Sequence, residues 1–427
     1  MSAVVPAPSQ PPMLITSTLA GLVMQQGHFP TILGHLGTAT GLLAQSQALL
    51  ERLACTDQDV RAQRAQLSYY MGERAFWQDM VAARPWFEES LALSRELDPI
   101  EGPAGLCLGI IAYFQGDYRE ATQRLVETRR LSHESGNIML DQSALSCLAK
   151  VAVARGDLGT AERLAVELWG PSWDQDEGDR EFEETWDRGE FLAGLGRYAE
   201  AAPPLETMVT GCRERGSDIF LLRFLERQTW VEMHLGQYGR ALAVAKETQH
   251  VARRLGNARM NAIATCYVGC AALAKGELGD AEQCLAEAIE LHRAHGNLAG
   301  LGEALNAMGL AVRGLGRGEE ARAYACEALA IGLETEGFLA MAGGLAAAAL
   351  LLADGGARER AVELWALLSR HPQIANSRWY EDVAGKHIAA LAAELPPEVV
   401  AAAQERGRAR DLDATVEELL AEWRAPP

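Results

Sequence analysis

Residues 229–241 read TWVEMHLGQYGRA, and the spacing within this stretch is the strongest structural signal in the chain. The small residue Thr229 is followed after seven positions by Gly236 and after five more by Ala241. The same pattern returns every 40 residues. An internal repeat of this length indicates stacked supersecondary units. Its three columns are Gly109, Ala149, Gly189, Thr229, Gly269, Gly309 and Ala349; Gly116, Gly156, Gly196, Gly236, Gly276, Gly316 and Gly356; and Ala121, Ala161, Ala201, Ala241, Ala281, Ala321 and Ala361.

These three columns resemble conserved positions of the tetratricopeptide repeat, a helix-turn-helix unit. Small side chains at the outer two columns let the paired helices cross closely, and the glycine suits the left-handed backbone of the turn between them. The usual unit has 34 residues, so the extra six lengthen each helix by roughly 4 to 5 Å. Second helices are expected to end on left-handed caps at Gly136, Gly216, Gly256 and Gly296, with Gly337 displaced by one position.

We therefore predict an all-α fold, a right-handed superhelical α-solenoid of tetratricopeptide-like helical hairpins with a 40-residue period. Residues 1–13 are proline-rich and are expected to form a disordered lead-in. The remaining ranges are an N-terminal helical cap at 14–56, about eight hairpins at 57–377, and a C-terminal helical cap at 378–427. Pro203 and Pro204 predict a late start, near Ala201, for one of the second helices.

The charge balance argues against direct nucleic-acid binding. The 58 acidic residues outnumber the 39 basic ones and give a net charge of −19, whereas a nucleic-acid surface needs a basic footprint. The first lysine or arginine is Arg52, so the leader resembles neither a secretory nor a mitochondrial signal. The apolar run at 338–353 is too short for a membrane span and falls in register as the first helix of a repeat. We expect a cytoplasmic protein without membrane contact.

The sequence carries no recognisable catalytic or metal-binding motif. It has no phosphate loop, no nucleophile elbow, no zinc-protease motif and no dinucleotide fingerprint. Cys266 and Cys270 lie one helical turn apart, but no second pair completes a zinc site. His292 and His295 are more consistent with solvated surface than with a metal site. We predict no enzyme activity, no cofactor and no metal.

The concave face of the solenoid is the predicted binding surface, because in such arrays the first helix of each hairpin lines it. The third, fourth and sixth regular hairpins place tryptophan, arginine and acids there, a mixture typical of binding hot spots. The alternative is that the tryptophans pack between repeats and the charges pair within the chain. The candidate residues are Trp186, Glu190, Arg223, Glu226, Trp230, His234, Asn306 and Arg313.

An acidic segment at 170–184 interrupts the third hairpin. It contains Trp173 among several aspartates and glutamates. Such a segment serves either as a docking site for a partner or as a solvated linker, and we favour the linker.

The long repeat unit, the run GRYAEAAPPLE from Gly196 to Glu206 and the tail LPPEVVAAAQERGRARDLDATVEELLAEW from Leu395 to Trp423 resemble one protein family. It comprises the bacterial signal-transduction ATPases with numerous domains (STAND proteins), including maltose-activator-like LuxR-type regulators. The resemblance covers roughly residues 57–424. It implies a sensor region that recognises a protein, a peptide or a small-molecule inducer, with an upstream nucleotide-binding module in the full-length protein. The alternative function is a free-standing adaptor that scaffolds a protein complex.

Overall fold

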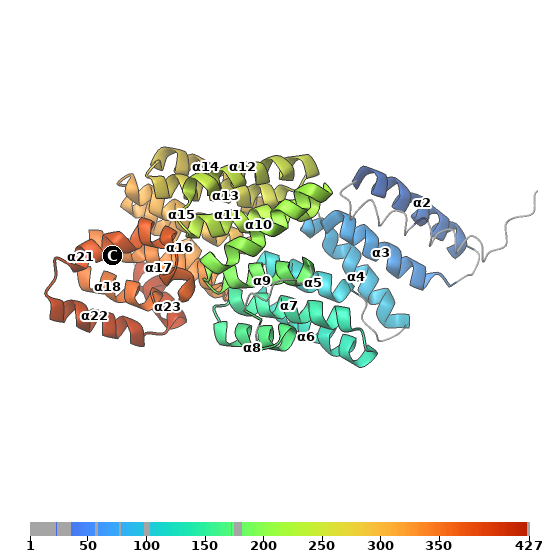
Figure 1. Ribbon diagram of the computed structural model, residues 1–427, viewed down its shortest axis with the longest axis horizontal. Coiled ribbons are helices and arrows are strands. Elements are labelled where there is room, and N and C mark those ends of the chain that lie inside the picture. The colour runs from blue at the N-terminus through green and yellow to red at the C-terminus, as the bar shows by residue number, and fades with distance from the viewer. Residues whose placement is uncertain are drawn as a thin grey trace, which may run out of the picture.

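The computed structural model describes residues 23, 36–55, 59–76, 78–97, 103–171, 173–174 and 182–424, with only the backbone at 36, 182–186 and 424. The predicted lead-in at 1–13 and most of the predicted N-terminal cap lie outside these residues. The described part is an all-α helical-repeat solenoid, which confirms the predicted fold class (Figure 1). It begins with α2 (Leu36–Ala54) and an irregular hairpin of α3 (Arg61–Phe76) and α4 (Met80–Leu97).

Regular hairpins with a 40-residue period follow, and each consists of two antiparallel helices. In order they are α5 (Ala104–Gln115) with α6 (Tyr118–Ser135), α7 (Ile138–Ala154) with α8 (Leu158–Trp169), α9 (Phe182–Gly194) with α10 (Tyr198–Arg215), α11 (Asp218–His234) with α12 (Tyr238–Leu255), α13 (Ala258–Lys275) with α14 (Leu278–Ala294), α15 (Leu298–Gly314) with α16 (Gly318–Thr335), and α17 (Phe338–Asp354) with α18 (Arg358–Leu368).

The three repeat columns act in the structure as their residue types suggest. All seven turn glycines are left-handed, with φ between +75° and +86°. The alanine column is buried, and the small-residue column lies directly against the second helix. At Gly269, for example, a Cβ atom would lie 2.7 Å from Leu285 Cγ. A larger side chain would therefore separate the two helices of a hairpin.

The caps of the second helices follow the predicted glycines with one correction. Gly136, Gly216, Gly256 and Gly296 all have positive φ. In the sixth regular hairpin the left-handed residue is Glu336, with φ of 57°, while Gly337 is extended with φ of −89° and ψ of 106°. Because the second helices of successive hairpins have similar lengths, the left-handed cap keeps its position in the 40-residue repeat. The glycine one position later does not change that position.

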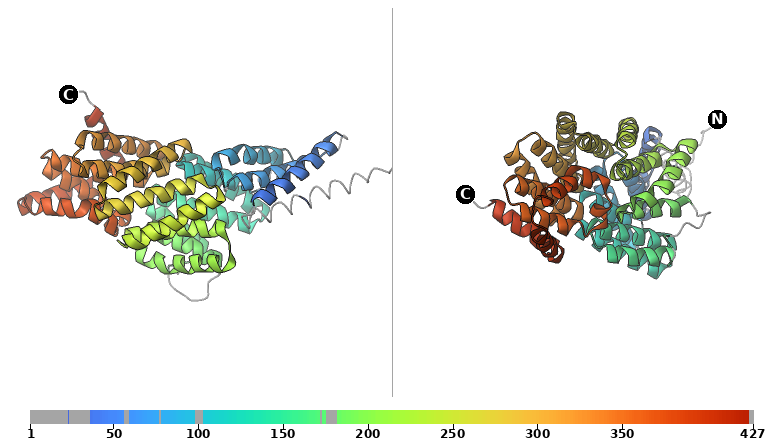
Figure 2. Two further views of the ribbon diagram at one scale, coloured as in Figure 1. Left: turned by 90° about the horizontal axis from the view of Figure 1, so that it is seen from above. Right: turned by 60° about the vertical axis from the view of Figure 1, so that its left-hand side comes forward.

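The solenoid winds far enough for its early and late hairpins to touch (Figure 2). A Cβ atom on Gly116 would lie 3.3 Å from the backbone nitrogen of Ala299, although these residues belong to hairpins far apart in sequence. Beside this contact the Glu336 carboxylate pairs with Arg119 at 3.2 Å and with Arg155 at 2.5 Å. The first helices therefore surround a central hollow along part of the molecule.

The chain next enters this hollow. Residues 371–382, which we call the strap, form α19 (Pro372–Ala375), α20 (Arg378–Tyr380) and the start of the π-helix η1 (Glu381–Gly385). Tyr198 donates to the Gln373 carbonyl at 2.7 Å, and Trp379 Nε1 donates to the Cys270 carbonyl at 3.0 Å. Part of the segment predicted as a terminal cap thus lies inside the solenoid.

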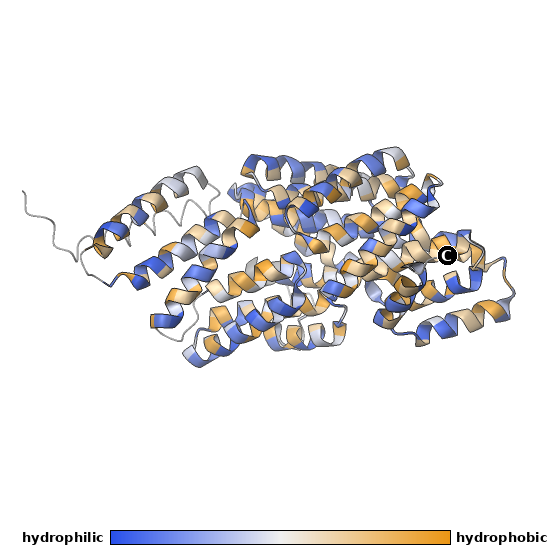
Figure 3. Ribbon diagram, turned by 180° about the vertical axis from the view of Figure 1, so that it is seen from behind, coloured by the Kyte–Doolittle hydropathy of each residue, from blue (hydrophilic) through white to orange (hydrophobic). Residues whose placement is uncertain are grey.

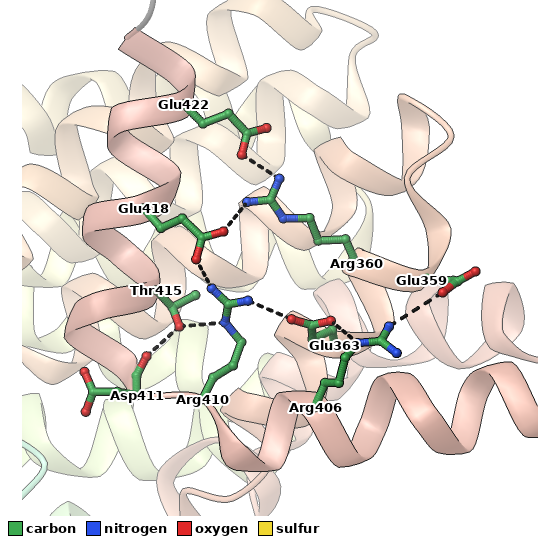
Figure 4. A network of polar contacts seen from close by, with 9 residues as sticks. All are labelled: Glu359, Arg360, Glu363, Arg406, Arg410, Asp411, Thr415, Glu418 and Glu422. Carbon is green, nitrogen blue, oxygen red and sulfur yellow. Dashed lines mark hydrogen bonds and ion pairs between the residues drawn. The ribbon is translucent and has the colours of Figure 1, made fainter.

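Only the last helices cover the end of the array. They are α21 (Lys386–Ala392), α22 (Pro397–Ala409) and α23 (Leu412–Arg424), and α22 packs along α18. A network of ion pairs joins α22, α23 and the link between them to α18 (Figure 4). At its centre the buried Glu363 accepts from Arg406 and Arg410, each at 2.8 Å. This network fixes the orientation of the final helices.

Apolar residues face the interior between helices, while polar residues cover the outer surface (Figure 3). The apolar run at 338–353 forms most of α17 and is almost wholly buried. Across the described residues, no helix has the length and apolar character needed to cross a membrane. The predicted late start of α10 is wrong: the helix begins at Tyr198 and includes Pro203 and Pro204, because buried Tyr198, Ala201 and Leu205 hold the whole helix in the array.

Candidate binding hollow

The hollow contains a cavity of about 150 Å³ lined mainly by the first helices of the hairpins. Aromatic side chains form much of its wall: Tyr113, Phe114, Tyr118, Trp230 and Tyr267. Smaller depressions continue from it. Two of them share Phe114 and Arg259 with the cavity on the side of α4, and another shares Trp230 and Glu303 with it beneath the strap. The inner wall is therefore a series of connected recesses.

Predicted wall residue Glu190 lies at the centre of a buried ionic cluster. Its carboxylate contacts Lys150 at 2.8 Å, Arg223 at 3.6 Å and Arg227 at 3.4 Å, and only 10% of its side chain is exposed. Burial alone would raise the pKa of this carboxyl, but the three cations outweigh that effect and hold the pKa well below its usual range. Glu190 therefore stays ionised, and Arg223 is one of the cations that keep it so.

Glu226 continues the polar wall toward the cavity. It accepts a hydrogen bond from the Tyr267 hydroxyl at 3.0 Å and lies 3.8 Å from Arg227. The guanidinium of Arg227 in turn lies 5.3 Å from the centre of the Trp230 ring. A chain of alternating charges thus runs from α7 through α9 to α11, and the Tyr267 hydroxyl joins it to α13.

Trp230 and His234 form an aromatic cluster with Tyr198. The imidazole of His234 stacks on Tyr198 with centroids 4.6 Å apart, and Trp230 meets both rings edge-on. His234 Nδ1 lies 2.6 Å from the Ser377 hydroxyl of the strap. Burial, and then the nearby charge of Arg227, lowers the pKa of His234 to about 3. The neutral imidazole therefore serves to hold the strap, and Trp230 reaches the cavity from beside it.

The other predicted wall residues lie apart from this cluster. Asn306 is buried and donates to the Leu339 and Ala340 carbonyls at 3.3 and 3.1 Å, which joins α15 to α17. Arg313 forms a two-pronged ion pair with Asp354 at 2.7 Å and lines none of the recesses described above. The side chain of Trp186 lies outside the described residues.

The sequence-based selection missed several polar residues of the cavity, among them Arg227, Arg259, His292, Glu303 and Gln373. Glu303 stands six positions before the small residue Gly309, in the same column as Arg223, so that column contained the signal. His292 belongs to a second helix and Gln373 to the strap. No column of first-helix residues would have found these two.

Comparisons with known proteins bear on the fold. No family model matches the chain, and no curated protein matches it. The Cut9–Hcn1 hetero-tetramer of the APC/C is similar in structure, with a TM-score of 0.53 and 12% identity over 95% of this chain and 76% of that chain. Because the identity is so low, this similarity shows the shared helical-repeat fold alone.

Two further solved structures align at lower scores. A Rap protein complexed with competence and sporulation factor has a TM-score of 0.48 and 15% identity, over 96% of this chain and all of that chain. A STAND protein with a tetratricopeptide repeat sensor from Pyrococcus horikoshii has a TM-score of 0.42 and 12% identity, over 98% and 68% of the two chains.

The predicted acidic segment is only partly described. Trp173 is buried against Trp169 and Phe191, with ring centroids 5.9 and 5.2 Å apart, and Arg197 lies over its ring. This tryptophan is therefore a core residue and is not available to a partner. The acids at 175–181 lie outside the described residues.

The described ranges include the cysteine pair singled out in the sequence. There, no cluster of histidine, cysteine and carboxylate side chains has the geometry of a metal site. Cys266 and Cys270 face each other with sulfurs 4.0 Å apart, and burial contributes to raising the pKa of the Cys266 thiol, after its hydrogen bond to Cys270. A raised pKa keeps the reactive thiolate scarce.

Proposed function

We propose that this chain is a non-catalytic binding module that recognises a protein, a peptide or a small-molecule inducer in its central hollow. The observation that carries the proposal is the strap, an irregular segment of the chain that the inner wall already binds. Besides the contacts of Tyr198 and Trp379, Asn376 donates to the Gly196 carbonyl at 3.1 Å. A wall that holds one such segment through backbone and side-chain bonds has the chemistry to hold another in the recesses beyond it.

The candidate wall for this role comprises Glu190, Arg223, Glu226 and Trp230, with Trp186 included from the sequence. These residues stand on two successive first helices, α9 and α11, so a ligand that spans them contacts two hairpins at once. Small changes in the angle between hairpins then add up along the array. We propose that binding shifts the population of superhelical pitches in this way, as a sensor requires.

The resemblance of the repeats and the tail to STAND regulators supports the more specific proposal that the chain is a sensor region. In such a protein the hollow would receive the inducer, and an upstream nucleotide-binding module would respond to the changed pitch. We place this activity in the cytoplasm.

Selection from a random dodecapeptide library tests the binding function. We expect selected peptides to bind the wild-type protein with micromolar affinity. Arg223→Ala should weaken that binding at least tenfold, because Arg223 lines one of the recesses together with Glu190 and would contact a ligand there. Arg313→Ala is the matched control, since that arginine pairs with Asp354 away from the recesses. Peptides that bind both variants as tightly as wild type would place the binding surface elsewhere.

The adaptor remains the second candidate because of one feature of the outer surface. Ile138 and Met139, at the start of α7, are 70% and 77% exposed. Adjacent exposed apolar residues are common at partner contacts. If the chain is an adaptor, Ile138→Glu should abolish association with its partner while Arg223→Ala leaves it intact.

A further inference from the structure

The cavity is lined by two charged groups, Arg259 and Glu303, that have no ion-pair partner among the residues that the structure describes. Arg259 stands at the start of α13, and among the described residues no carboxylate lies within ion-pair distance of it. Its guanidinium lies 4.2 Å from the centre of the Phe114 ring and makes one weak contact with Met260 Sδ at 3.3 Å. An aromatic face compensates the partial desolvation of a cation only in part. Burial lowers the pKa of Arg259 to about 10.

His292 supplies a second unpartnered donor near Arg259. It is 1% exposed, so the expectation that this histidine is solvated is wrong. Its Nδ1 lies 3.1 Å from Asn297 Nδ2, while Asn297 Oδ1 accepts from Gly300 N. The amide nitrogen therefore donates to Nδ1, which places the imidazole proton on Nε2. Nε2 has no hydrogen-bond partner. Burial, and then the positive charge of Arg259, lowers the pKa of His292 to about 3, so the ring is neutral.

A region of the opposite sign lies on the wall formed by α15. Glu303 makes no hydrogen bond or ion pair with any residue that the structure describes, although it lines both the cavity and the recess beneath the strap. Burial and the nearby carboxylate of Glu226 raise its pKa to about 7, against the opposing effect of Arg227. Gln373 of the strap adds an amide, 2% exposed, of which neither polar atom has a hydrogen-bond partner.

Unpaired buried polar groups are expensive for a fold, and such groups are usually satisfied by one another, by water or by a ligand. Here a cation with a free N–H donor and a free carboxylate line the same aromatic-walled cavity. A cavity of about 150 Å³ accepts a molecule as large as a benzene ring. The arrangement fits an occupant with a negative group, an apolar body and a positive group.

We propose that the cavity binds a small zwitterion, a free amino acid or a dipeptide, with its carboxylate at Arg259 and His292 and its ammonium group at Glu303. The aromatic rings of Phe114, Trp230 and Tyr267 enclose the apolar body. Gln373 contacts the occupant from the strap, so the ligand joins the strap to the wall. This proposal rests on the binding function proposed above and gives its ligand a chemical class.

Thermal unfolding and calorimetry with single amino acids and with dipeptides of apolar amino acids test the proposal. We expect at least one free zwitterion to raise the melting temperature and to bind with a Kd below 1 mM. Amidation of its carboxyl or acetylation of its amino group should each weaken binding at least tenfold. The two probe sizes distinguish an amino acid from a dipeptide.

Two variants assign the two ends of the ligand. Arg259→Met should bind the free zwitterion and its amide equally, because it lacks the cation that distinguishes a carboxylate from an amide. Glu303→Gln should bind the free zwitterion and its acetylated form equally, because it lacks the carboxylate that distinguishes an ammonium group from an acetylated amine. Both variants replace a partly buried charge that has no ion-pair partner among the described residues, so we expect them to fold. Arg313→Met, which removes a paired arginine on α15, should bind as the wild type does.

The experiments distinguish a wrong zwitterion site from a wrong binding function. If no zwitterion raises the melting temperature, or if both variants bind the hit as the wild type does, the zwitterion site is wrong. Should the dodecapeptides nonetheless bind and lose affinity in Arg223→Ala, the binding function stands with a different ligand.

Discussion

At the scale of single residues, Gly196 has less room for a side chain than the turn glycine Gly276. Its φ is +77°, and a Cβ atom there would lie 2.5 Å from the carbonyl carbon of Pro372 in the strap. Gly276 has φ of +80° and open space around it. We expect Gly276→Ala to lower the free energy of unfolding by about 1 kcal/mol, from the left-handed backbone alone. Gly196→Ala should lower it by more than about 2 kcal/mol, because the strap must also move.

Urea denaturation of the two variants measures this difference. Equal losses of stability would show that the strap does not press against this turn.

Glu303 makes the stability of the protein depend on pH near neutrality. Its pKa is raised from 4.5 to about 7 in the folded protein. The resulting stabilisation is fully present below pH 4.5, where the carboxyl is protonated in both states, and is lost as the pH rises through 7. The unfolding free energy of the wild type should therefore decline between pH 5 and 8, and Glu303→Gln should remove about 1 to 2 kcal/mol of that decline. This figure allows for partial screening of the carboxyl by water in the hollow.

The measurement is the difference in unfolding free energy between wild type and Glu303→Gln across that range. Glu290→Gln, an exposed change on α14, controls for net charge. If the difference in unfolding free energy between wild type and Glu303→Gln does not change with pH, the Glu303 carboxyl is solvated in the folded protein.

At this scale the sequence could identify candidate residues but not their surroundings. The column rule selected Glu190 and Arg223, which do face the hollow, and also Arg313, which pairs with Asp354 at another place. Whether a charged side chain is neutralised depends on partners from other helices. Glu190 has three cations around it, whereas Glu303 on α15 has no cation in ion-pair contact among the residues that the structure describes. The periodic pattern does not contain that difference.

At the scale of elements, Glu363 decides how firmly α22 and α23 are attached to α18. Its side chain is 10% exposed and pairs with Arg406 and Arg410, while neighbouring Glu359 is 58% exposed and lies 3.6 Å from Arg406. Glu363→Gln should destabilise the protein by about 1 to 2 kcal/mol because it leaves two arginines without their shared anion. Glu359→Gln should change stability by less than about 0.5 kcal/mol.

The same carboxyl gives this contact an acid limit. Burial alone would raise the pKa of Glu363, but the two arginines outweigh it and lower the pKa. The contribution is therefore present above the ordinary carboxyl range and is lost as the pH falls through the lowered pKa. Thermal unfolding from pH 3 to 7 should show wild type and Glu363→Gln converging at low pH. A gap that persists at pH 3 would assign the loss to packing.

Elements with a repeat period were predictable because spacing alone defines them. Each turn glycine, buried alanine and small crossing residue lies where the 40-residue period places it. The strap was not predictable, because its contacts join residues such as Tyr198 and Gln373 that are 175 positions apart. Pro203 and Pro204 also led to the wrong prediction of a late start for α10. The burial of the helix around them outweighs the backbone hydrogen bonds that the two prolines remove.

At the scale of the whole molecule, the winding of the solenoid changes how hairpins depend on one another. In an open array each repeat contacts only its neighbours, and disturbance at one end stays there. Here α5 contacts α15, and α11 contacts α20 of the strap. Hairpins distant in sequence thus share one packed interior. A ligand in the hollow would contact both sides of this closed arrangement, which is how binding could alter the pitch of the whole.

Trp379 provides a test of this long-range dependence. The ring is 5% exposed and its Nε1 donates to the Cys270 carbonyl of α13, 109 positions earlier. Trp379→Ala should reduce stability by about 3 to 5 kcal/mol and accelerate amide hydrogen exchange in α11 and α13 as well as in the strap. Trp423→Ala, which removes a ring stacked on Arg322 of the neighbouring α16, should accelerate exchange only in α16 and α23. If Trp379→Ala leaves α11 and α13 protected, the strap rests on the wall without stabilising it, and the hairpins behave as an open array despite their closed shape.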